Sequence, residues 1–201
     1  GIHSGHRGGS ETLKKERGAS GMDMQVLARE LAKHAGTVGI DPGARDTGVI
    51  SINPEGTSTR GFTVHNEGEL LPVPHSYLAA VIEAVRDAVE YAGGENALVK
   101  VESITRPNWH VAKDRKFGSA ANPAPLLGTA QVLGAVMAVY PDSVLVPPGK
   151  NGSSVLAAYP DFLIGPREKS KQGWQSRVGS GILRHQRSAW DVARFDTRFA
   201  K

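Results

Sequence analysis

The chain has no cysteine in its 201 residues, which excludes disulfide bonds, thiolate zinc sites and cysteine nucleophiles. It also has no apolar run long enough to cross a bilayer, and its first residues lack the apolar core of a signal peptide. These absences fit an intracellular protein without a membrane partner. The 24 Lys and Arg against 20 Asp and Glu give a net charge of +4, which tolerates a polyanionic partner without proving one.

The length fits one domain with a tail. Residues 1–36 begin with a Gly-rich polar stretch, and a few later apolar residues have helical spacing. We expect these residues to be a disordered or partly helical N-terminal tail. The folded domain is then expected at residues 37–201.

Residues 39–50 contain a short apolar run that ends in Asp41, turns through a Pro-Gly pair and resumes as Val-Ile. This pattern predicts a strand, a tight turn and a second strand, with Gly48 allowing a close backbone approach. Asp41 then lies at a strand C-terminus, where ligands collect in open α/β sheets, although aspartate also commonly caps turns. Asp46 is interpreted as a turn residue.

Apolar spacing and turn signals predict the remaining elements. Strands are expected at residues 61–64, 97–102 and 144–146, and helices at residues 75–91, 123–140 and 182–195. The first three strands should form an antiparallel meander, and the fourth, after a crossover helix, should lie parallel to the first. Asp41 and Glu102 would then lie side by side at one sheet edge.

Two such carboxylates repel each other unless a positive group lies between them. A hard divalent cation is the usual solution, and salt bridges to Arg45 and Arg106 are the alternative. The final predicted helix carries Asp191, with Ser188 three residues earlier on the same face. His185 lies about 120° from Asp191 on a continuous helix, so it can join Asp191 only if the helix starts later or bends.

Residues 103–125 form a long linker, directly after the fourth strand, in which aromatic and basic residues alternate. Its cations suit phosphates and its aromatic side chains suit stacking on a base, although a solvated loop with two anchoring aromatics fits equally well. Gly149 and Lys150 do not form a phosphate loop, because the glycine that this loop requires is missing at position 144. Lys150 is still interpreted as a phosphate contact. The candidate nucleic-acid contacts are Arg106, Trp109, Lys113, Arg115, Lys116, Phe117 and Lys150.

The predicted helix at 123–140 is apolar on almost every side, so more than one of its faces must be covered. One face can pack on the sheet. The other is either a subunit interface, where Gly128 and Gly134 permit close approach, or is buried within the fold. In residues 151–180 the sequence pattern indicates only one helical turn, at about 155–159, followed by a polar, basic linker.

The chain resembles RuvC-type Holliday-junction resolvases of the RNase H-like superfamily. The resemblance rests on a first strand reading Gly-Ile-Asp-Pro-Gly, a following Thr-Gly, Glu102 on the fourth strand and Ala-x-Asp-x-Ala around Asp191. It spans roughly residues 37–195. The C-terminal segment His-x-x-Ser-Ala-Trp-Asp-Val-Ala resembles phage-type members more than the bacterial housekeeping form. It implies an α/β, RNase H-like fold with a mixed five-stranded sheet in the order 3-2-1-4-5, strand 2 antiparallel, flanked by helices.

The resemblance also implies a structure-selective endodeoxyribonuclease that resolves four-way DNA junctions by paired symmetric nicks. Two Mg²⁺ ions about 4 Å apart, replaceable by Mn²⁺, would hydrolyse the phosphodiester. Asp41, Glu102 and Asp191 would be catalytic metal ligands. The family usually has Asp or His where this chain has Ser188, so Ser188 acts through water, His185 supplies the missing function, or three acids suffice.

The same resemblance implies a homodimer on branched DNA, with the helix at 123–140 as the interface, in the cytoplasm of a bacterial or phage-infected cell. Two other functions stay open. A catalytically inactive module that binds branched DNA is kept open by Ser188. An actin-like ATPase fragment is disfavoured, because 201 residues contain no second Asp-x-Gly motif before a strand.

Overall fold

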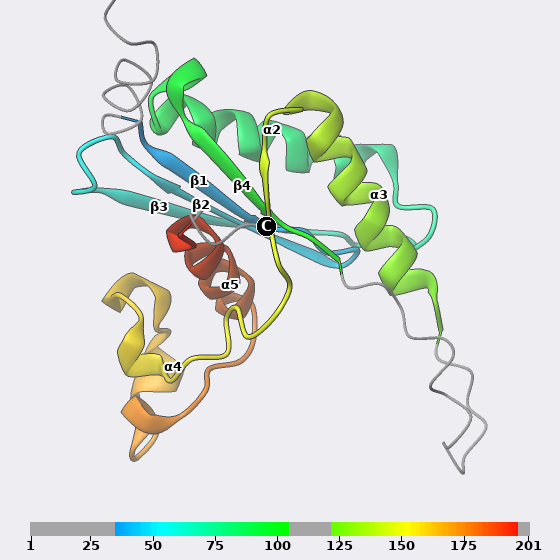
Figure 1. The fold of residues 1–201 in the computed structure, drawn as a ribbon. Helices are drawn as coiled ribbons and strands as arrows, with labels where there is room; N and C mark the ends of the chain where they lie inside the picture. Colours follow the sequence, from blue (N-terminus) through cyan, green and yellow to red (C-terminus); the bar gives the residue numbers. More distant parts are fainter. Residues whose placement is uncertain (1–34, 105–121, 197–201) are drawn as a thin grey trace, which may run out of the picture.

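Five strands form a mixed sheet in the predicted order. The computed structural model describes residues 35–104 and 122–196. Its strands are β1 (Thr37–Asp41), β2 (Asp46–Ile52), β3 (Thr59–His65), β4 (Leu98–Glu102) and β5 (Val144–Val146). They lie in the order β3-β2-β1-β4-β5, with β2 antiparallel to both neighbours and β4 parallel to β1 and β5 (Figure 1). The predicted strand order and strand directions are confirmed.

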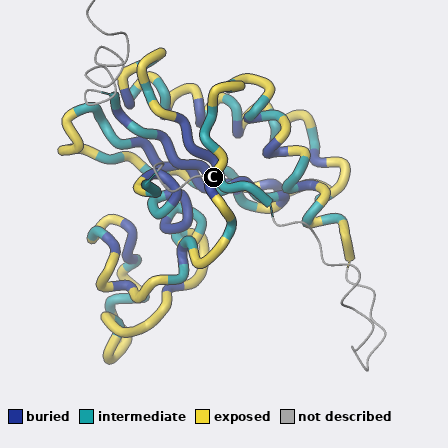
Figure 2. Tube along the Cα trace, viewed as in Figure 1, coloured by how far each residue is buried: buried dark blue, intermediate teal, exposed yellow. Residues whose placement is uncertain are grey.

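Helices cover both faces of this sheet. On one face lie α2 (His75–Tyr91) and α3 (Ala124–Val139), and α5 (Leu183–Arg194) crosses the other (Figure 1). The three long helices agree with the predicted ranges to within a residue or two. Burial is concentrated in the central strands and the helix sides that face them (Figure 2). No helix in the described ranges has the length and apolarity needed to cross a membrane.

Side chains of β1 alternate between the two faces, as a strand requires. Val38 and Ile40 are fully buried in the core with α2 and α3. Gly39 points the other way, where a Cβ would overlap the backbone of Ala189 and Ala193 in α5, and a Cβ on Gly48 would overlap the carbonyl of His185. The backbone of α5 therefore lies directly on the sheet, as predicted for Gly48 but not foreseen for Gly39.

Gly39→Val is expected to lower the free energy of unfolding by about 3 kcal/mol or more, because the new side chain needs space that the α5 backbone occupies. Gly134→Ala on α3 is the control, since a Cβ there meets nothing within 4 Å. It should raise stability by about 0.5–1 kcal/mol through helix propensity. Urea unfolding of both variants measures the difference. Equal stabilities would contradict the close packing of α5.

Lys100 of β4 fixes the C-terminal end of α5. Its side chain is buried, and Nζ donates to the carbonyls of Ala193 at 2.8 Å and Phe195 at 2.7 Å. Burial lowers the pKa of Lys100, and the charge of Asp196 opposes that shift. A cation at the last carbonyls of a helix also interacts favourably with the helix dipole. Lys100 thus holds the helix against the strand that carries Glu102.

Residues 150–182 form a succession of short helices, which we refer to as the short-helix module. Its elements are η3 (Leu156–Ala158), η4 (Asp161–Leu163), α4 (Pro166–Lys169) and η5 (Trp174–Ser176). A second apolar core joins this module to α5 and β2, formed by Ile50, Leu156, Tyr159, Leu163, Ile164, Ala189 and Ala193. The turn near residue 156 is confirmed, but the predicted linker after it is wrong. A helix of one turn contains too few apolar residues to show helical periodicity in the sequence.

Arg187 of α5 ties the helix to the short-helix module. Its buried guanidinium donates to the carboxylate of Glu168 at 3.0 and 3.1 Å, to the carbonyl of Leu163 at 2.7 Å and to that of Ser180 at 3.2 Å. Burial opposes the charge of Glu168, but hydrogen bonds from the Gly165 N–H and from Arg187 outweigh it, so the pKa of Glu168 is lowered.

This lowered pKa predicts a pH dependence of stability. The carboxylate of Glu168 stabilises the fold above its ordinary pKa of 4.5, and that contribution is lost as the pH falls through the lower pKa of the folded state. Glu168→Gln should therefore be less stable than the wild type at about pH 7, with the gap closing in acid. Thermal unfolding across this range measures the gap. A gap that stays constant with pH would contradict the assignment.

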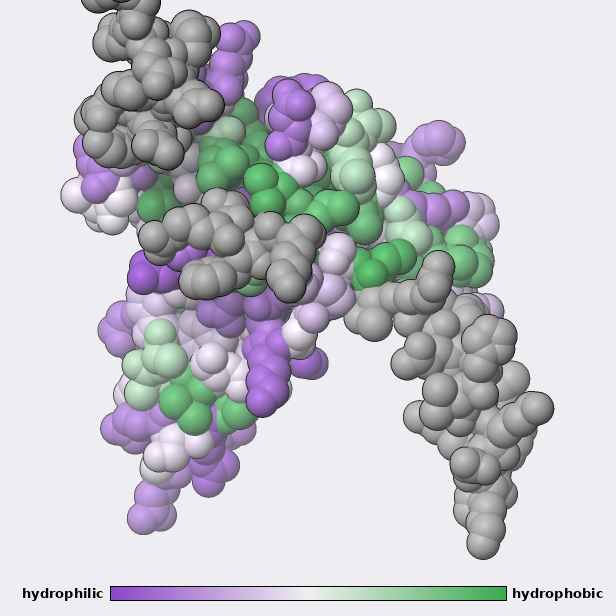
Figure 3. Space-filling view, in the orientation of Figure 1, coloured by the Kyte–Doolittle hydropathy of each residue, from purple (hydrophilic) through white to green (hydrophobic). Residues whose placement is uncertain are grey.

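One side of α3 packs on the fold and the other is open. Val132 and Val136 are fully buried, and Gly128 lies against Ala44 and Leu70 of the same chain. Apolar residues at both ends of the helix, Leu127 and Val139, are 44% and 45% exposed. Hydrophobic residues gather over this part of the surface (Figure 3). Among the described residues, the alternative of a wholly internal helix is therefore wrong.

Candidate active site

Asp41 and Glu102 lie side by side at the ends of β1 and β4, as predicted. The parallel register pairs Ile40 with Val101, so the next residue on each strand is an acid. Burial, and then the neighbouring carboxylate of Asp41, raise the pKa of Glu102 to about 7, although a hydrogen bond from Asn151 lowers it. This shift is the one expected when two carboxylates share a half-buried site. We refer to Asp41 and Glu102 as the acid pair.

Arg45 does not neutralise the acid pair. Its guanidinium donates to the carbonyls of Asn66 at 2.6 Å and Gly68 at 3.2 Å. In residues 35–104 and 122–196 it forms no ion pair with an acid. The salt-bridge alternative is therefore wrong for Arg45, and Arg106 lies outside the described residues.

Two neutral side chains orient Glu102. Asn151 Nδ2 donates to Oε1 at 2.8 Å, and the buried Ser188 Oγ donates to Oε2 at 3.3 Å. Ser188 thus bonds Glu102 directly, whereas the predicted alternative had it act through water. Asn151 was not singled out from the sequence. The available signal was its position just after β5, at the same edge of the parallel strands where Glu102 ends β4.

His185 contacts Asp41 from the first turn of α5. Its Nδ1 lies 3.0 Å from Asp41 Oδ2. The hydrogen bond to Asp41 raises the pKa of His185, and burial opposes this shift. Since α5 is continuous from Leu183 to Arg194, the condition that the helix starts after His185 is not met. His185 therefore joins the first-strand acid rather than Asp191.

Asp191 is turned toward the short-helix module. Its Oδ2 accepts the backbone N–H of Gly152 and the hydroxyl of Tyr159, each at 2.8 Å. Burial and the bond to Asp191 raise the pKa of Tyr159. At 100° per residue, His185, Ser188 and Asp191 follow one another at intervals of about 60° around α5. Each therefore meets a different partner.

The sequence predicts that Asp41, Glu102 and Asp191 lie together, and the structure brings together Asp41 and Glu102. Across the described ranges, no three Asp, Glu or His side chains are arranged to hold a metal ion. Oδ2 of the third acid, Asp191, is bonded to Gly152 and Tyr159. The donor chemistry nevertheless fits a hard divalent cation, because the acid pair offers carboxylate oxygens whose mutual repulsion, seen in the raised pKa of Glu102, a cation would relieve.

Asp46 is more than a turn residue, so that interpretation is wrong. It begins β2, and its Oδ1 lies 2.7 Å from Nδ1 of His65. Its Oδ2 is 3.9 Å from Nε2 of His185. The signal in the sequence was its spacing of two from Gly48, which places both residues on the face of β2 that carries α5.

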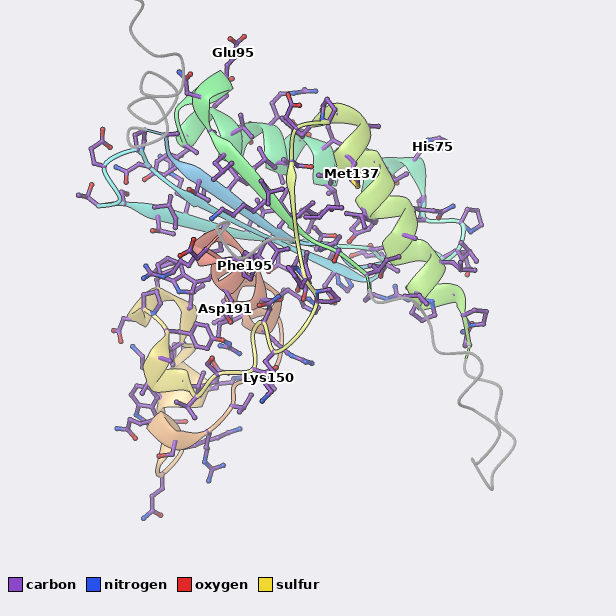
Figure 4. All side chains as sticks on the ribbon, in the orientation of Figure 1. His75, Glu95, Met137, Lys150, Asp191 and Phe195 are labelled. Carbon is purple, nitrogen blue, oxygen red and sulfur yellow. The ribbon has the colours of Figure 1, made fainter. Side chains whose placement is uncertain are left out.

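The predicted nucleic-acid contacts could be located for one residue only. Lys150 is exposed and directly precedes Asn151. It is the first residue of the short-helix module (Figure 4), two residues before Gly152, which bonds Asp191. The other candidates lie outside the described residues, as does almost all of the predicted N-terminal tail: Arg106, Trp109, Lys113, Arg115, Lys116 and Phe117.

Comparison with known proteins finds a likeness in fold. No protein-family profile matches the chain, and no curated protein matches it. A structure of T. thermophilus RuvC in complex with a Holliday junction substrate is 15% identical, with a TM-score of 0.41. A second Thermus thermophilus RuvC structure is 17% identical, with a TM-score of 0.39. Each alignment covers 79% of this chain and 90% of the other.

Proposed function

We propose that this protein is a structure-selective endodeoxyribonuclease that resolves four-way DNA junctions by paired symmetric nicks. The supporting observation is the acid pair at the ends of two parallel strands, with His185 and Ser188 of α5 bonded to it. An inactive module that binds branched DNA is the second candidate. It would have no use for two half-buried carboxylates held in contact at the cost of a raised pKa.

Mg²⁺ is the proposed cofactor, with Mn²⁺ as a substitute. Asp41 and Glu102 would hold it, with Ser188 and, once its side chain turns away from Gly152 and Tyr159, Asp191 as further oxygen donors. Of two bound ions, one would lower the pKa of an attacking water and the other would stabilise the leaving 3′ oxygen. These donors are all oxygen atoms, which hard cations prefer.

The chain's own residues orient these donors. His185 holds Oδ2 of Asp41, while Asn151 and Ser188 each hold one oxygen of Glu102. Carboxylates with fixed orientation bind a cation with less loss of conformational entropy than free ones. The hydrogen bonds that position the acid pair are therefore part of the proposed site.

We infer that the working form is a homodimer, because resolution of a four-way junction needs two symmetric cuts. A two-fold dimer would supply two identical sites. The open apolar side of α3, with Leu127 and Val139, is the proposed interface.

The test is cleavage of a labelled synthetic four-way junction with Mg²⁺. The wild type and Asp142→Asn, an exposed aspartate after α3, should introduce symmetric nicks, and Asp41→Asn should not. Junction binding without nicks by the wild type would favour the inactive module. Equal nicking by Asp41→Asn would rule out the acid pair as the catalytic centre.

Tyr159 should act as a positioning residue for Asp191. Tyr159→Phe removes the hydroxyl that donates to Asp191 Oδ2 at 2.8 Å, and should slow nicking about 10–100-fold, as loss of a group that orients a ligand does. The Mg²⁺ concentration for half-maximal nicking should also rise.

Tyr140→Phe, at the end of α3, is the matched control and should leave both quantities unchanged. Faster nicking by Tyr159→Phe would mean that the hydroxyl restrains Asp191, which contradicts a positioning role.

A further inference from the structure

The segment that leads into α5 has an excess of positive charge. Residues 150–184, which comprise the short-helix module and the start of α5, contain six Lys and Arg and two Asp and Glu. Six minus two gives +4, which equals the net charge of all 201 residues. The charges of the remainder of the chain sum to zero, so residues 150–184 carry an excess equal to the whole net charge.

Both acids of this segment are already neutralised. Asp161 pairs with Lys169 at 2.7 Å, and Glu168 is bound by Arg187 and by two backbone N–H groups. Five exposed cations have no acid partner among the described residues: Lys150, Arg167, Lys171, Arg177 and Arg184. Their charges are available to an external partner.

Two of these cations line a hollow in the short-helix module. It has a volume of about 290 Å³, and its lining includes Lys171, Arg177, Gly179 and Ser180. Glu168 is the one acid in the lining, and both its oxygens accept hydrogen bonds from this chain. Hydrophilic residues surround a smaller hydrophobic group at this end of the molecule (Figure 3). The hollow therefore favours an anion.

Two more cations are sequence neighbours of residues that bond the acid pair. Lys150 precedes Asn151, which bonds Glu102, and Arg184 precedes His185, which bonds Asp41. Arg187 joins the module to the same helix through Glu168. The cations thus extend from the acid pair onto a module that is fixed to α5.

We propose that the short-helix module is a second DNA-binding surface, which holds the phosphate backbone of a duplex arm beside the acid pair. The identity of the polyanion as DNA rests on the proposed function. The contact is to phosphates, so it adds affinity and orientation without sequence preference. Its residues are not those of the linker at residues 103–125 that the sequence singled out.

The test compares two double variants with the same loss of charge. Lys171→Gln/Arg177→Gln alters the hollow, and Arg60→Gln/Arg86→Gln alters exposed cations at β3 and α2. Binding to a labelled four-way junction and to a linear duplex is measured by fluorescence anisotropy without Mg²⁺, over a range of salt concentrations. Melting temperatures verify that both variants are folded.

The hollow variant should bind both DNAs about tenfold more weakly, with the slope of log affinity against log salt reduced by about 2. The control pair should match the wild type. Equal behaviour of the two double variants would overturn the proposal, as would equal affinity of the wild type for anionic phospholipid vesicles.

Nicking by the wild type is scored separately, so the two proposals can fail independently. Junction cleavage with an unchanged salt slope in the hollow variant would overturn the second DNA surface alone. A reduced slope with no cleavage by the wild type would leave the surface standing and remove the nuclease.

Discussion

Arg187→Met is expected to lower the free energy of unfolding by about 3–5 kcal/mol, because it leaves a partly buried carboxylate without its cation. Arg187 is fully buried and donates to Leu163, Glu168 and Ser180. Four hydrogen bonds between α5 and the short-helix module would be lost together. Chemical denaturation at neutral pH measures the change.

Arg184→Met is the matched control, since Arg184 lies three residues earlier on the same helix and is exposed. Its effect should stay within about 0.5 kcal/mol, as for most surface substitutions. A cost of Arg187→Met no larger than that of Arg184→Met would mean that the module is not fixed to α5 by this side chain.

Glu102→Gln is expected to reduce junction nicking by more than about 100-fold, because removal of a ligand should exceed the effect of removing its orienting partners. The replacement keeps the shape of the side chain, and its amide oxygen can still accept from Asn151. The new amide N–H₂ can donate to Asp41. Loss of activity would therefore come without loss of structure.

The same variant should be more stable than the wild type when no divalent metal is present. The raised pKa of Glu102, about 7, means that folding is favoured with this group protonated. Its contribution is fully present below the ordinary pKa of 4.5 and is lost as the pH rises through 7.

At about pH 8, Glu102→Gln should gain about 1 kcal/mol, a figure reduced for partial solvent screening. Thermal unfolding in a chelator measures it. A variant that is both less stable and inactive would contradict the repulsion between the two carboxylates.

The acid pair could be predicted because it depends on local patterns. Each acid ends an apolar run, and a crossover helix between two strands makes them parallel, so both acids reach one edge. The close approach at Gly48 was predictable for the same reason. The fold follows from these short-range signals and from the resemblance.

The sequence could not predict which residues the side chains of α5 form hydrogen bonds with. Helical spacing gives the angles between His185, Ser188 and Asp191, but not what lies opposite each side chain. Asp191 bonds Gly152 and Tyr159, which belong to a module of single turns that has no readable period. Contacts between such segments depend on tertiary packing, which periodicity does not encode.

The most direct test of the central claim uses a supercoiled plasmid that extrudes a cruciform, incubated with the protein and Mg²⁺. Paired symmetric nicks across the four-way junction convert this plasmid to a linear form with hairpin ends, each with a nick that ligase can seal. The account predicts linear product with the wild type and none with Asp41→Asn or Glu102→Gln. Intact plasmid with the wild type, or linear product with either variant, would contradict it.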